Sequence, residues 1–288
     1  MTRRVALLGK PLRRRHSVVM HNAAFAAAGI DAEYVLAELD PEEVAAAVAE
    51  ARGPDWLGLG VTAPYKQVVA GLVDEVEPDA RSIGAVNNVH RTDDGRLIGF
   101  NTDAPGFRAG VELALGRPIE GLDVVVAGAG GAAHAVVFAC LQAGARRIAV
   151  ANRSPRSARA LVDRFSGNGR REHPELTPTR LGDAAFQRAV RAADLVVNAT
   201  TVGMLDPGMT IPVADLRDDA TVFDLVYVPP ETPLLRAARE RGLRAANGSE
   251  MLIQQAAIAF ERWTGVAGMA DVMRSAVAPL LADAALRA

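Results

Sequence analysis

The chain has 288 residues, of which 50% are apolar and 23% charged, and its formal net charge is −2. A chain of this length is long for one hydrophobic core, so we expect two domains. The small negative charge argues against nucleic acid or an anionic membrane as a main partner, the single Cys140 excludes an internal disulfide and a cysteine-based zinc cluster, and no apolar run reaches the roughly 18 residues of a membrane span.

The first hundred residues alternate between predicted strands and helices. The expected elements are a strand Val5–Gly9, a helix from about Ser17 to Ala28, a helix start at Asp40-Pro41-Glu42-Glu43, a strand Trp56–Val61, a helix beginning at Pro64 and a hairpin around Asp94-Gly95. No secretion signal precedes the first strand, so the cytoplasm is the expected location. This pattern predicts a complete small α/β unit.

A second α/β unit begins with a stretch typical of dinucleotide-binding proteins. Val124–Ala127 is an apolar run without polar alternation, which indicates a strand buried on both faces of a parallel sheet. A G-x-G-x-x-A pattern follows, then a helix ending at Gly144 and a strand Arg147–Ala151. Glycine allows a sharp turn close to a pyrophosphate, whose charge the helix N-terminus stabilises. The predicted cofactor-binding residues of the loop are Gly128, Ala129, Gly130, Gly131 and Ala132.

The end of the second strand indicates which dinucleotide is bound. An NAD site usually has an acidic residue about 20 residues after the glycines, but Asn152, Arg153 and Ser154 stand here, with Arg156 close behind. A guanidinium offers charge-assisted donors to the 2′-phosphate of NADP. We therefore predict NADP, the alternative being that Arg153 is a solvated surface residue.

The rest of the chain continues the alternation and ends in two helices. The expected elements are helices Arg156–Phe165, Ala184–Ala192 and Pro233–Arg241, strands Asp194–Asn198 and Thr221–Val226, and two helices over 250–285, broken near Gly265–Gly268. The predicted architecture is a split substrate domain (1–103 with 248–288) and a Rossmann-type domain (104–247). The active site is expected in the cleft between them.

Two polar clusters outside the cofactor domain are unlike packing residues. One is Gly60–Lys66, and the other combines Gly84–Asn88 with Gly99–Asp103. A nicotinamide supplies a hydride, so the protein has to supply a proton-transfer group and hold the reacting carbon. Lysine beside a carboxylate is suited to that task, because the ammonium is fixed in place and burial beside the carboxylate tunes its pKa.

With these motifs the chain resembles the shikimate dehydrogenase family, from Gly9 nearly to its end. The motifs, in order, are G-x-P, V-T-x-P-x-K (61–66), G-A-V-N (84–87), N-T-D (101–103), G-A-G-G-A (128–132), N-A-T-x-x-G-M (198–204), Asp224–Tyr227 and M-L-x-x-Q (251–255). The resemblance implies a two-domain α/β fold and an enzyme of aromatic amino acid biosynthesis, on the chorismate pathway. Its reaction would be the reversible NADP-dependent conversion of 3-dehydroshikimate and shikimate.

The resemblance also implies roles for residues. Lys66 and Asp103 match the catalytic pair of the family. The positions that match substrate ligands are Thr62, Asn87, Gln255, Tyr227 and Ser17, and those that match contacts of the nicotinamide end are Leu225 and Gly248. Tyrosine at a strand end is also often simply packed, which is the alternative for Tyr227. Neutral donor–acceptor groups suit a substrate with several ring hydroxyls.

The chain departs from the family at the expected carboxylate site. Where the family has S-x-S-P, this chain has Arg15-His16-Ser17-Val18, and Gly60 replaces an asparagine, which is expected to make room. Three interpretations stay open. An arginine of the run Arg13–Arg15 binds the carboxylate, the arginines face solvent, or the pocket accepts a relative of shikimate such as quinate or an amino-substituted analogue.

Further alternatives concern the cofactor and the function class. The family's N-R-T-x-x-R reads N-R-S-P-R-S here, so NAD use stays open. A weakly active NADP-binding regulatory relative is less favoured, because the proton-transfer pair is retained. A methylenetetrahydrofolate dehydrogenase type ranks low, because it has no reason to carry G-A-V-N with N-T-D. No metal site is expected from His16 and His21, and the oligomeric state is expected to be a monomer or a homodimer.

Overall fold

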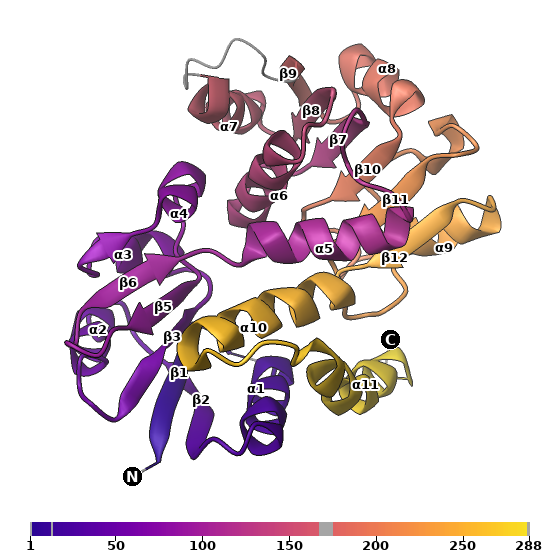
Figure 1. The fold of residues 1–288 in the computed structure, drawn as a ribbon. Helices are drawn as coiled ribbons and strands as arrows, with labels where there is room; N and C mark the ends of the chain where they lie inside the picture. Colours follow the sequence, from indigo (N-terminus) through magenta and orange to yellow (C-terminus); the bar gives the residue numbers. More distant parts are fainter. Residues whose placement is uncertain (1, 13, 167–174, 287–288) are drawn as a thin grey trace. The chain divides into compact units, whose positions relative to one another are not determined.

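The computed structural model describes residues 2–12, 14–166 and 175–286 (Figure 1). The chain divides into two compact units. The first comprises Met1–Asp103 and Ile253–Leu280, and the second Ala104–Leu252 and Leu281–Ala288. Over the described residues, no helix has both the length and the apolar character needed to cross a bilayer.

A mixed six-stranded sheet forms the centre of the first unit. Its strands are β1 (Arg3–Gly9), β2 (Ala32–Glu38), β3 (Trp56–Val61), β4 (Glu75–Val76), β5 (Asn88–Arg91) and β6 (Leu97–Phe100), in the order β2-β1-β3-β5-β6-β4. β1 and β3 are parallel, whereas β5 is antiparallel to both β3 and β6. The carboxyl ends of β1, β3 and β6 and the amino end of β5 therefore meet at one edge.

Helices pack on this sheet through apolar and aromatic side chains. The helices that pack on it are α1 (His16–Ala27), α2 (Val44–Glu50), α3 (Lys66–Ala70), α4 (Pro78–Ile83) and α10 (Ser249–Thr264). A further helix, α11 (Ala270–Leu286), follows α10 at the end of the chain. Val44 and Val48 of α2 pack with Leu59 and Val61 of β3. The Trp263 indole of α10 donates a hydrogen bond of 2.9 Å to the Val89 carbonyl oxygen, so the later part of α10 is anchored to the sheet.

A wholly parallel six-stranded sheet forms the second unit (Figure 1). Its strands are β7 (Asp123–Ala127), β8 (Arg147–Asn152), β9 (Glu175–Arg180), β10 (Leu195–Asn198), β11 (Thr221–Asp224) and β12 (Arg244–Asn247), in the order β12-β11-β10-β7-β8-β9. β7 is buried along its whole length and lies between β8 and β10. The direction of winding reverses at β7, and ligands of such sheets bind outside the carboxyl ends of the strands at this point.

Helices connect the strands of the second sheet. They are α6 (Gly131–Gln142), α7 (Pro155–Ser166), α8 (Ala184–Ala192) and α9 (Pro233–Glu240), with a short 3₁₀ helix η1 (Val213–Asp215), whereas α5 (Asp103–Leu115) leads from β6 of the first sheet to β7. α8 and α9 begin where side-chain oxygens cap them: Asp183 accepts from the Phe186 N–H (2.7 Å), and Thr232 from the Leu235 N–H (3.3 Å). The predicted fold class, a two-domain α/β protein with a Rossmann-type unit, is confirmed.

Two helices begin later than the sequence predicts. α2 begins at Val44 rather than near Asp40, and the intervening residues form a turn. The Asp40 carboxylate pairs with the Lys10 ammonium, and the Glu43 carboxylate accepts from the Asp40 N–H at 2.6 Å, so the predicted capping interaction is present in a turn before the helix. α3 begins at Lys66, two residues after the predicted Pro64.

Candidate active site

Polar residues gather at the edge of the first sheet described above. Thr62 follows β3, Asn87 precedes β5, and Asp103 comes three residues after the end of β6. The backbone N–H of Thr62 still bonds the Leu8 carbonyl oxygen (2.9 Å), so the strand pairing continues to this position. Residues far apart in the sequence therefore meet because the strand directions bring their ends together.

Lys66 and Asp103 form a direct ion pair at this edge. The Lys66 ammonium nitrogen lies 2.6 Å from Asp103 Oδ2, and the two side chains are 25% and 14% exposed. The second carboxylate oxygen, Oδ1, accepts a hydrogen bond of 2.9 Å from the Asn87 amide. Asp103 opens α5, and its N–H donates to Asn101 Oδ1 at 2.9 Å. The ammonium is therefore held by a carboxylate whose own position is fixed from two sides.

A buried hydrogen-bond network extends from this pair to α10. Asn87 Oδ1 accepts from the Thr102 N–H (2.8 Å) and from the Asn88 amide (2.9 Å). The Thr102 hydroxyl lies 3.2 Å from Gln255 Oε1, which links the network to α10. The structure thus brings together four predicted site residues: Lys66, Asp103, Asn87 and Gln255.

Thr102 and Asn88 are members of this network that the sequence analysis did not assign to the site. Both are buried, and each bonds other members on more than one side. They lie inside the N-T-D and G-A-V-N-N stretches, so their position in these motifs was the sequence feature that could have identified them as site residues. Their role is to orient Asn87, because together they occupy its amide oxygen.

The arrangement is suited to proton transfer beside a molecule with several hydroxyl groups. A partly exposed ammonium offers protons, and the amides and hydroxyls around it both donate and accept. Thr62 adds a half-buried side chain, whose Cγ2 would lie 2.4 Å from any Cβ added at Gly9. The G-x-P loop therefore runs close past Thr62, and a larger residue at Gly9 would displace it.

The predicted carboxylate-binding residues lie at the start of α1. Arg15 is exposed at the N-cap position, where no side-chain capping bond forms, and Ser17 is half-buried in the first turn. No hydrogen bond joins Arg15 or Ser17 to the Lys66–Asp103 pair within the described ranges. Arg14 is half-buried, and Arg13 lies outside the described residues.

The expectation that Gly60 makes room is wrong. A Cβ added at Gly60 would lie 2.5 Å from the Tyr34 hydroxyl oxygen and 3.2 Å from Leu7 Cδ1. The phenol of β2 therefore fills the space that a side chain on β3 would use. Sequence alone does not reveal this, because residues 34 and 60 belong to strands that are not neighbours in the sheet.

The glycine loop of the second unit has the shape of a phosphate cradle. Gly128 has φ +122°, and a Cβ there would lie 2.7 Å from the Ala199 carbonyl oxygen, so only glycine fits. Gly130 and Gly131 are exposed, and a Cβ at either would meet nothing within 4 Å. The loop thus leaves open space in front of the first turn of α6, where backbone N–H groups favour an anion. The residues present fit a dinucleotide pyrophosphate.

The residues predicted to select the cofactor follow β8 at the same carboxyl edge. The Asn152 amide donates to the Ser154 carbonyl oxygen (3.4 Å), and Ser154 Oγ accepts from the Ser157 N–H (3.4 Å) at the start of α7. Arg153 is exposed, and its side chain makes no ion pair or hydrogen bond with the described residues. A guanidinium in this position is available to an anionic ligand.

Leu225, Tyr227 and Gly248 lie beyond the carboxyl ends of β11 and β12. A Cβ on Gly248 would lie 2.3 Å from the Leu225 carbonyl oxygen, so the two backbones are in close contact and a side chain at 248 is excluded. Tyr227 follows Leu225 by two residues and is half-buried. The predicted cofactor contacts of the second unit therefore share one edge of its sheet, together with the glycine loop.

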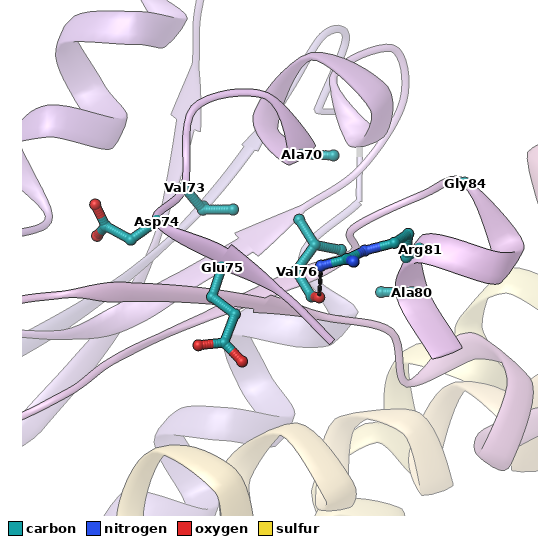
Figure 2. A pocket seen from close by; sticks show the side chains of 8 residues that line it. All are labelled: Ala70, Val73, Asp74, Glu75, Val76, Ala80, Arg81 and Gly84. Atoms are coloured by element: carbon teal, nitrogen blue, oxygen red, sulfur yellow. Dashed lines mark hydrogen bonds between the residues drawn. The ribbon is translucent and has the colours of Figure 1, made fainter. Parts of the chain in front are cut away.

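Figure 2 shows another hollow in the first unit. Its cavity volume is about 460 Å³, and it is lined by Ala70, Val73, Asp74, Glu75, Val76, Ala80, Arg81 and Gly84. Its charged groups already have partners: Asp74 pairs with Arg52, Glu75 with Arg96, and Arg81 donates to the Val76 carbonyl oxygen at 3.0 Å. The hollow contains none of the predicted site residues, and we assign it no function.

No group of three or more histidine, cysteine, aspartate and glutamate side chains in the part of the chain that is described could hold a metal ion. His21 is buried and stacked on Tyr34, with a ring-centroid distance of 4.4 Å. Burial lowers the pKa of His21 to about 3. It therefore packs as a neutral aromatic ring.

Comparison with known proteins places these two edges in context. The chain matches the family descriptions "Shikimate dehydrogenase substrate binding domain" over residues 7–89, "Shikimate / quinate 5-dehydrogenase" over 112–205 and "Shikimate 5'-dehydrogenase C-terminal domain" over 248–278. A relative from Moorella thermoacetica, named shikimate dehydrogenase (NADP(+)), is 42% identical over 279 residues, which are 95% of this chain and 93% of the relative.

Solved structures show the same similarity. The shikimate 5-dehydrogenase of Thermus thermophilus, in complex with NADP(H) and shikimate, is 36% identical with a TM-score of 0.82, over 95% of this chain and 99% of that one. The quinate dehydrogenase of Corynebacterium glutamicum, in complex with NAD, is 34% identical with a TM-score of 0.86, over 96% and 99% of the two chains.

Proposed function

The chain belongs to the shikimate dehydrogenase family, and from this premise we propose that it catalyses the reversible NADP-dependent reduction of 3-dehydroshikimate to shikimate. The reduction adds a hydride to the ring carbonyl carbon and a proton to its oxygen. NADPH, when bound, supplies the hydride. The protein then has to supply the proton and hold the ring.

The observation that carries this proposal is the Lys66–Asp103 pair. As the carbonyl accepts a hydride, charge develops on its oxygen, and an ammonium beside that oxygen stabilises the charge and gives up a proton. In the reverse direction the amine of Lys66 takes the proton of the alcohol. Asp103 keeps Lys66 in place at 2.6 Å, and Asn87 holds the other oxygen of Asp103.

Neutral polar groups next to this pair would bind the ring hydroxyls. The proposed ligands are Thr62, Asn87 and Gln255, with Tyr227 from the second unit and with Ser17 and Arg15 for the carboxylate. The Thr102 and Asn88 bonds fix the orientation of Asn87, and its amide nitrogen donates to Thr102 Oγ1 (3.1 Å) and Asp103 Oδ1 (2.9 Å). A ring hydroxyl bound here would share these bonds. Pre-oriented groups reduce the entropy cost of holding the substrate.

NADP would be held by the edge of the parallel sheet. The loop Gly128–Ala132 and the first turn of α6 would bind the pyrophosphate, Arg153 with Asn152 and Ser154 the 2′-phosphate, and Leu225 with Gly248 the nicotinamide end. The open space in front of Gly130 and Gly131 supports the first assignment. The exposed Arg153 guanidinium supports the second.

Quinate is the second candidate substrate. The similarity to a quinate dehydrogenase supports it, as does Arg15 at a position where the family has another residue. The proposal further includes the substrate role for the first unit, the cofactor role for the second, the cytoplasm as location, and a monomer or homodimer as assembly.

The proposal is tested by following NADP⁺ and NAD⁺ reduction with shikimate, quinate and amino-shikimate. We expect shikimate with NADP⁺ to give the highest kcat/KM. Lys66→Ala is expected to lower kcat at least ~100-fold, the low end for loss of a general acid–base group. Lys10→Ala is the matched control, because Lys10 also pairs with an aspartate, Asp40, but both side chains are largely exposed.

Two results would contradict the proposal. Turnover of Lys66→Ala near that of the wild type rejects the assigned role of Lys66. A higher kcat/KM for quinate or amino-shikimate than for shikimate rejects shikimate as the main substrate, while leaving the chemistry intact.

A further inference from the structure

Tyr34 is a buried residue whose hydroxyl group has no partner in the part of the chain that the structure describes. Tyr34 is 3% exposed, and its backbone N–H and carbonyl are both bonded by the Asn22 side chain, at 2.7 and 3.1 Å. No hydrogen bond reaches its phenol oxygen from the described residues. The phenol oxygen is not among the buried side-chain atoms that lack a partner, so it is not fully closed off from solvent although the ring is buried. Because buried tyrosines usually place the hydroxyl against a partner, a hydroxyl that keeps this access is available to a ligand.

The strand register places this hydroxyl close to the site edge. Val5 of the central strand is in register with Tyr34 on one side and with Gly58 on the other. The phenol oxygen, however, lies beside Gly60, one step further toward the carboxyl end of β3. Because side chains alternate along a strand, Gly60 and Thr62 belong to the same face of the sheet. The hydroxyl therefore lies one step below Thr62, on its face.

The aromatic ring of Tyr34 is fixed from two helices. The His21 ring of α1 stacks on it at 4.4 Å with an interplanar angle of 18°, and the Trp263 ring of α10 lies 6.1 Å away. Ser17 precedes His21 by four residues on α1, so the two share one face of that helix. The face of α1 that holds the phenol thus also carries the serine proposed for the substrate carboxylate.

We propose that the Tyr34 hydroxyl is a specificity-determining ligand that donates a hydrogen bond to the substrate carboxylate, in the place where Gly60 contributes no side chain. This inference rests on the proposed function. Burial raises the pKa of the Tyr34 phenol, so the group stays protonated and acts as a donor. A carboxylate accepts hydrogen bonds, so it needs donor groups around it. Ser17 in the first turn of α1 supplies a second donor.

Tyr34→Phe tests the inference, because it removes one oxygen and keeps the ring. We expect the KM for shikimate to rise at least ~10-fold, with kcat within ~3-fold of the wild type, since the hydroxyl does not touch the reacting carbon. The methyl ester of shikimate lacks the carboxylate charge, so its KM should change much less in the variant.

Tyr65→Phe is the matched control for folding. Tyr65 is also buried in the first unit, but its hydroxyl donates a 2.6 Å hydrogen bond to the Leu39 carbonyl oxygen. We therefore expect Tyr65→Phe to lower Tm and Tyr34→Phe to leave Tm unchanged. A loss of Tm in Tyr34→Phe as large as in Tyr65→Phe would show that the hydroxyl serves the fold, and would overturn the proposal.

Other results decide between the inference and its premise. A KM for shikimate within twofold of the wild type overturns the inference alone, as does an equal rise for shikimate and its methyl ester. A wild-type protein that turns over none of the cyclic hydroxy-acids overturns the proposed function and the inference together. A selective rise for shikimate, with Tm retained, supports both.

Discussion

Lysine–aspartate contacts occur twice in the first unit, and the surroundings of each residue decide what the contact does. Lys10 and Asp40 are 42% and 56% exposed, and pairs of that kind contribute at most about 1 kcal/mol to stability. Lys66 and Asp103 are much less exposed, and Asp103 also accepts from Asn87. Only the second contact has a neighbour that fixes the carboxylate, which is what a proton-transfer group requires.

The Arg15 side chain allows a prediction about how the substrate carboxylate is bound. Its guanidinium is exposed at the N-cap of α1, two residues before Ser17. If it binds the carboxylate, Arg15→Ala should raise the KM for shikimate about 10-fold and leave kcat unchanged, because the contact is the same in ground and transition states. Steady-state kinetics measure this, with Arg3→Ala as an exposed control on β1.

An unchanged KM in Arg15→Ala would place that side chain in solvent. Ser17 and the first turn of α1 would then remain as the carboxylate site. Equal losses in kcat and kcat/KM would instead mean that the arginine acts in the transition state, contrary to its position at the helix start.

The sequence predicts those helices and strands whose conformation follows from the pattern of their own residues. Continuous apolar runs predict β3 and β7, and α8 has the bounds predicted from its pattern, Ala184–Ala192. β2, β4, β9 and β12 were not predicted as strands, and each is an edge strand of its sheet. β4 has only two residues, and β9 carries a proline and alternates little. Short or edge strands depend on their neighbours in space for their conformation.

The site residues that lie in sequence motifs were predictable, whereas a side chain that reaches the site from another strand was not. Lys66, Asp103, Asn87 and Gln255 lie in motifs, and the structure joins them through hydrogen bonds. The part played by Tyr34 could not be predicted, because no local pattern tells which side chain from another strand fills the space at a glycine. That information exists only once β2, β1 and β3 lie side by side.

The contact of the Tyr34 side chain of β2 with Gly60 of β3, across β1, can be tested with a double-mutant cycle. Gly60→Ala places a Cβ 2.5 Å from the Tyr34 oxygen, and such overpacking typically costs about 1–3 kcal/mol of unfolding free energy. In Tyr34→Phe the next ring atom, Cζ, is 3.5 Å away, which is ordinary contact. We expect the double variant to be about 1 kcal/mol more stable than Gly60→Ala, as measured by urea unfolding.

Gly58→Ala is the matched control for this cycle. Its Cβ would lie 2.0 Å from the Val89 carbonyl oxygen and 2.7 Å from the Trp263 indole nitrogen, so the clash does not involve the Tyr34 hydroxyl. Tyr34→Phe should therefore not restore its stability. Additive effects of Gly60→Ala and Tyr34→Phe would contradict the contact between the two strands.

For the whole molecule, buried histidines couple stability to pH. Burial lowers the pKa values of His16, His21 and His90. His21 lies in the core of the first unit, and His90 lies on β5. Each of these groups binds a proton more readily in the unfolded chain than in the folded one. Asp123 has a lowered pKa of about 2, beside Arg147 and Arg146, so its contribution changes only at more acidic pH.

His21 allows the sign and size of this effect to be stated. Its pKa is about 3 in the folded protein against the ordinary value of 6.5, so the stability is fully present above pH 6.5 and is lost progressively as pH falls toward 3. Between pH 7.5 and 5 the loss from this residue is about 2 kcal/mol of unfolding free energy. His21→Phe keeps a ring against Tyr34 and removes the titrating group.

We therefore expect urea unfolding of His21→Phe to show a decrease between pH 7.5 and 5 that is smaller than in the wild type by about that amount. His16 and His90 remain, so part of the pH dependence persists in the variant. If the wild type and His21→Phe showed the same pH dependence, the pKa of His21 would have to be the same in the folded and the unfolded chain. A ring that stacks on Tyr34 in the aromatic core cannot satisfy that condition, because burial lowers the pKa of His21 and no charged group of the described residues contributes an opposing effect.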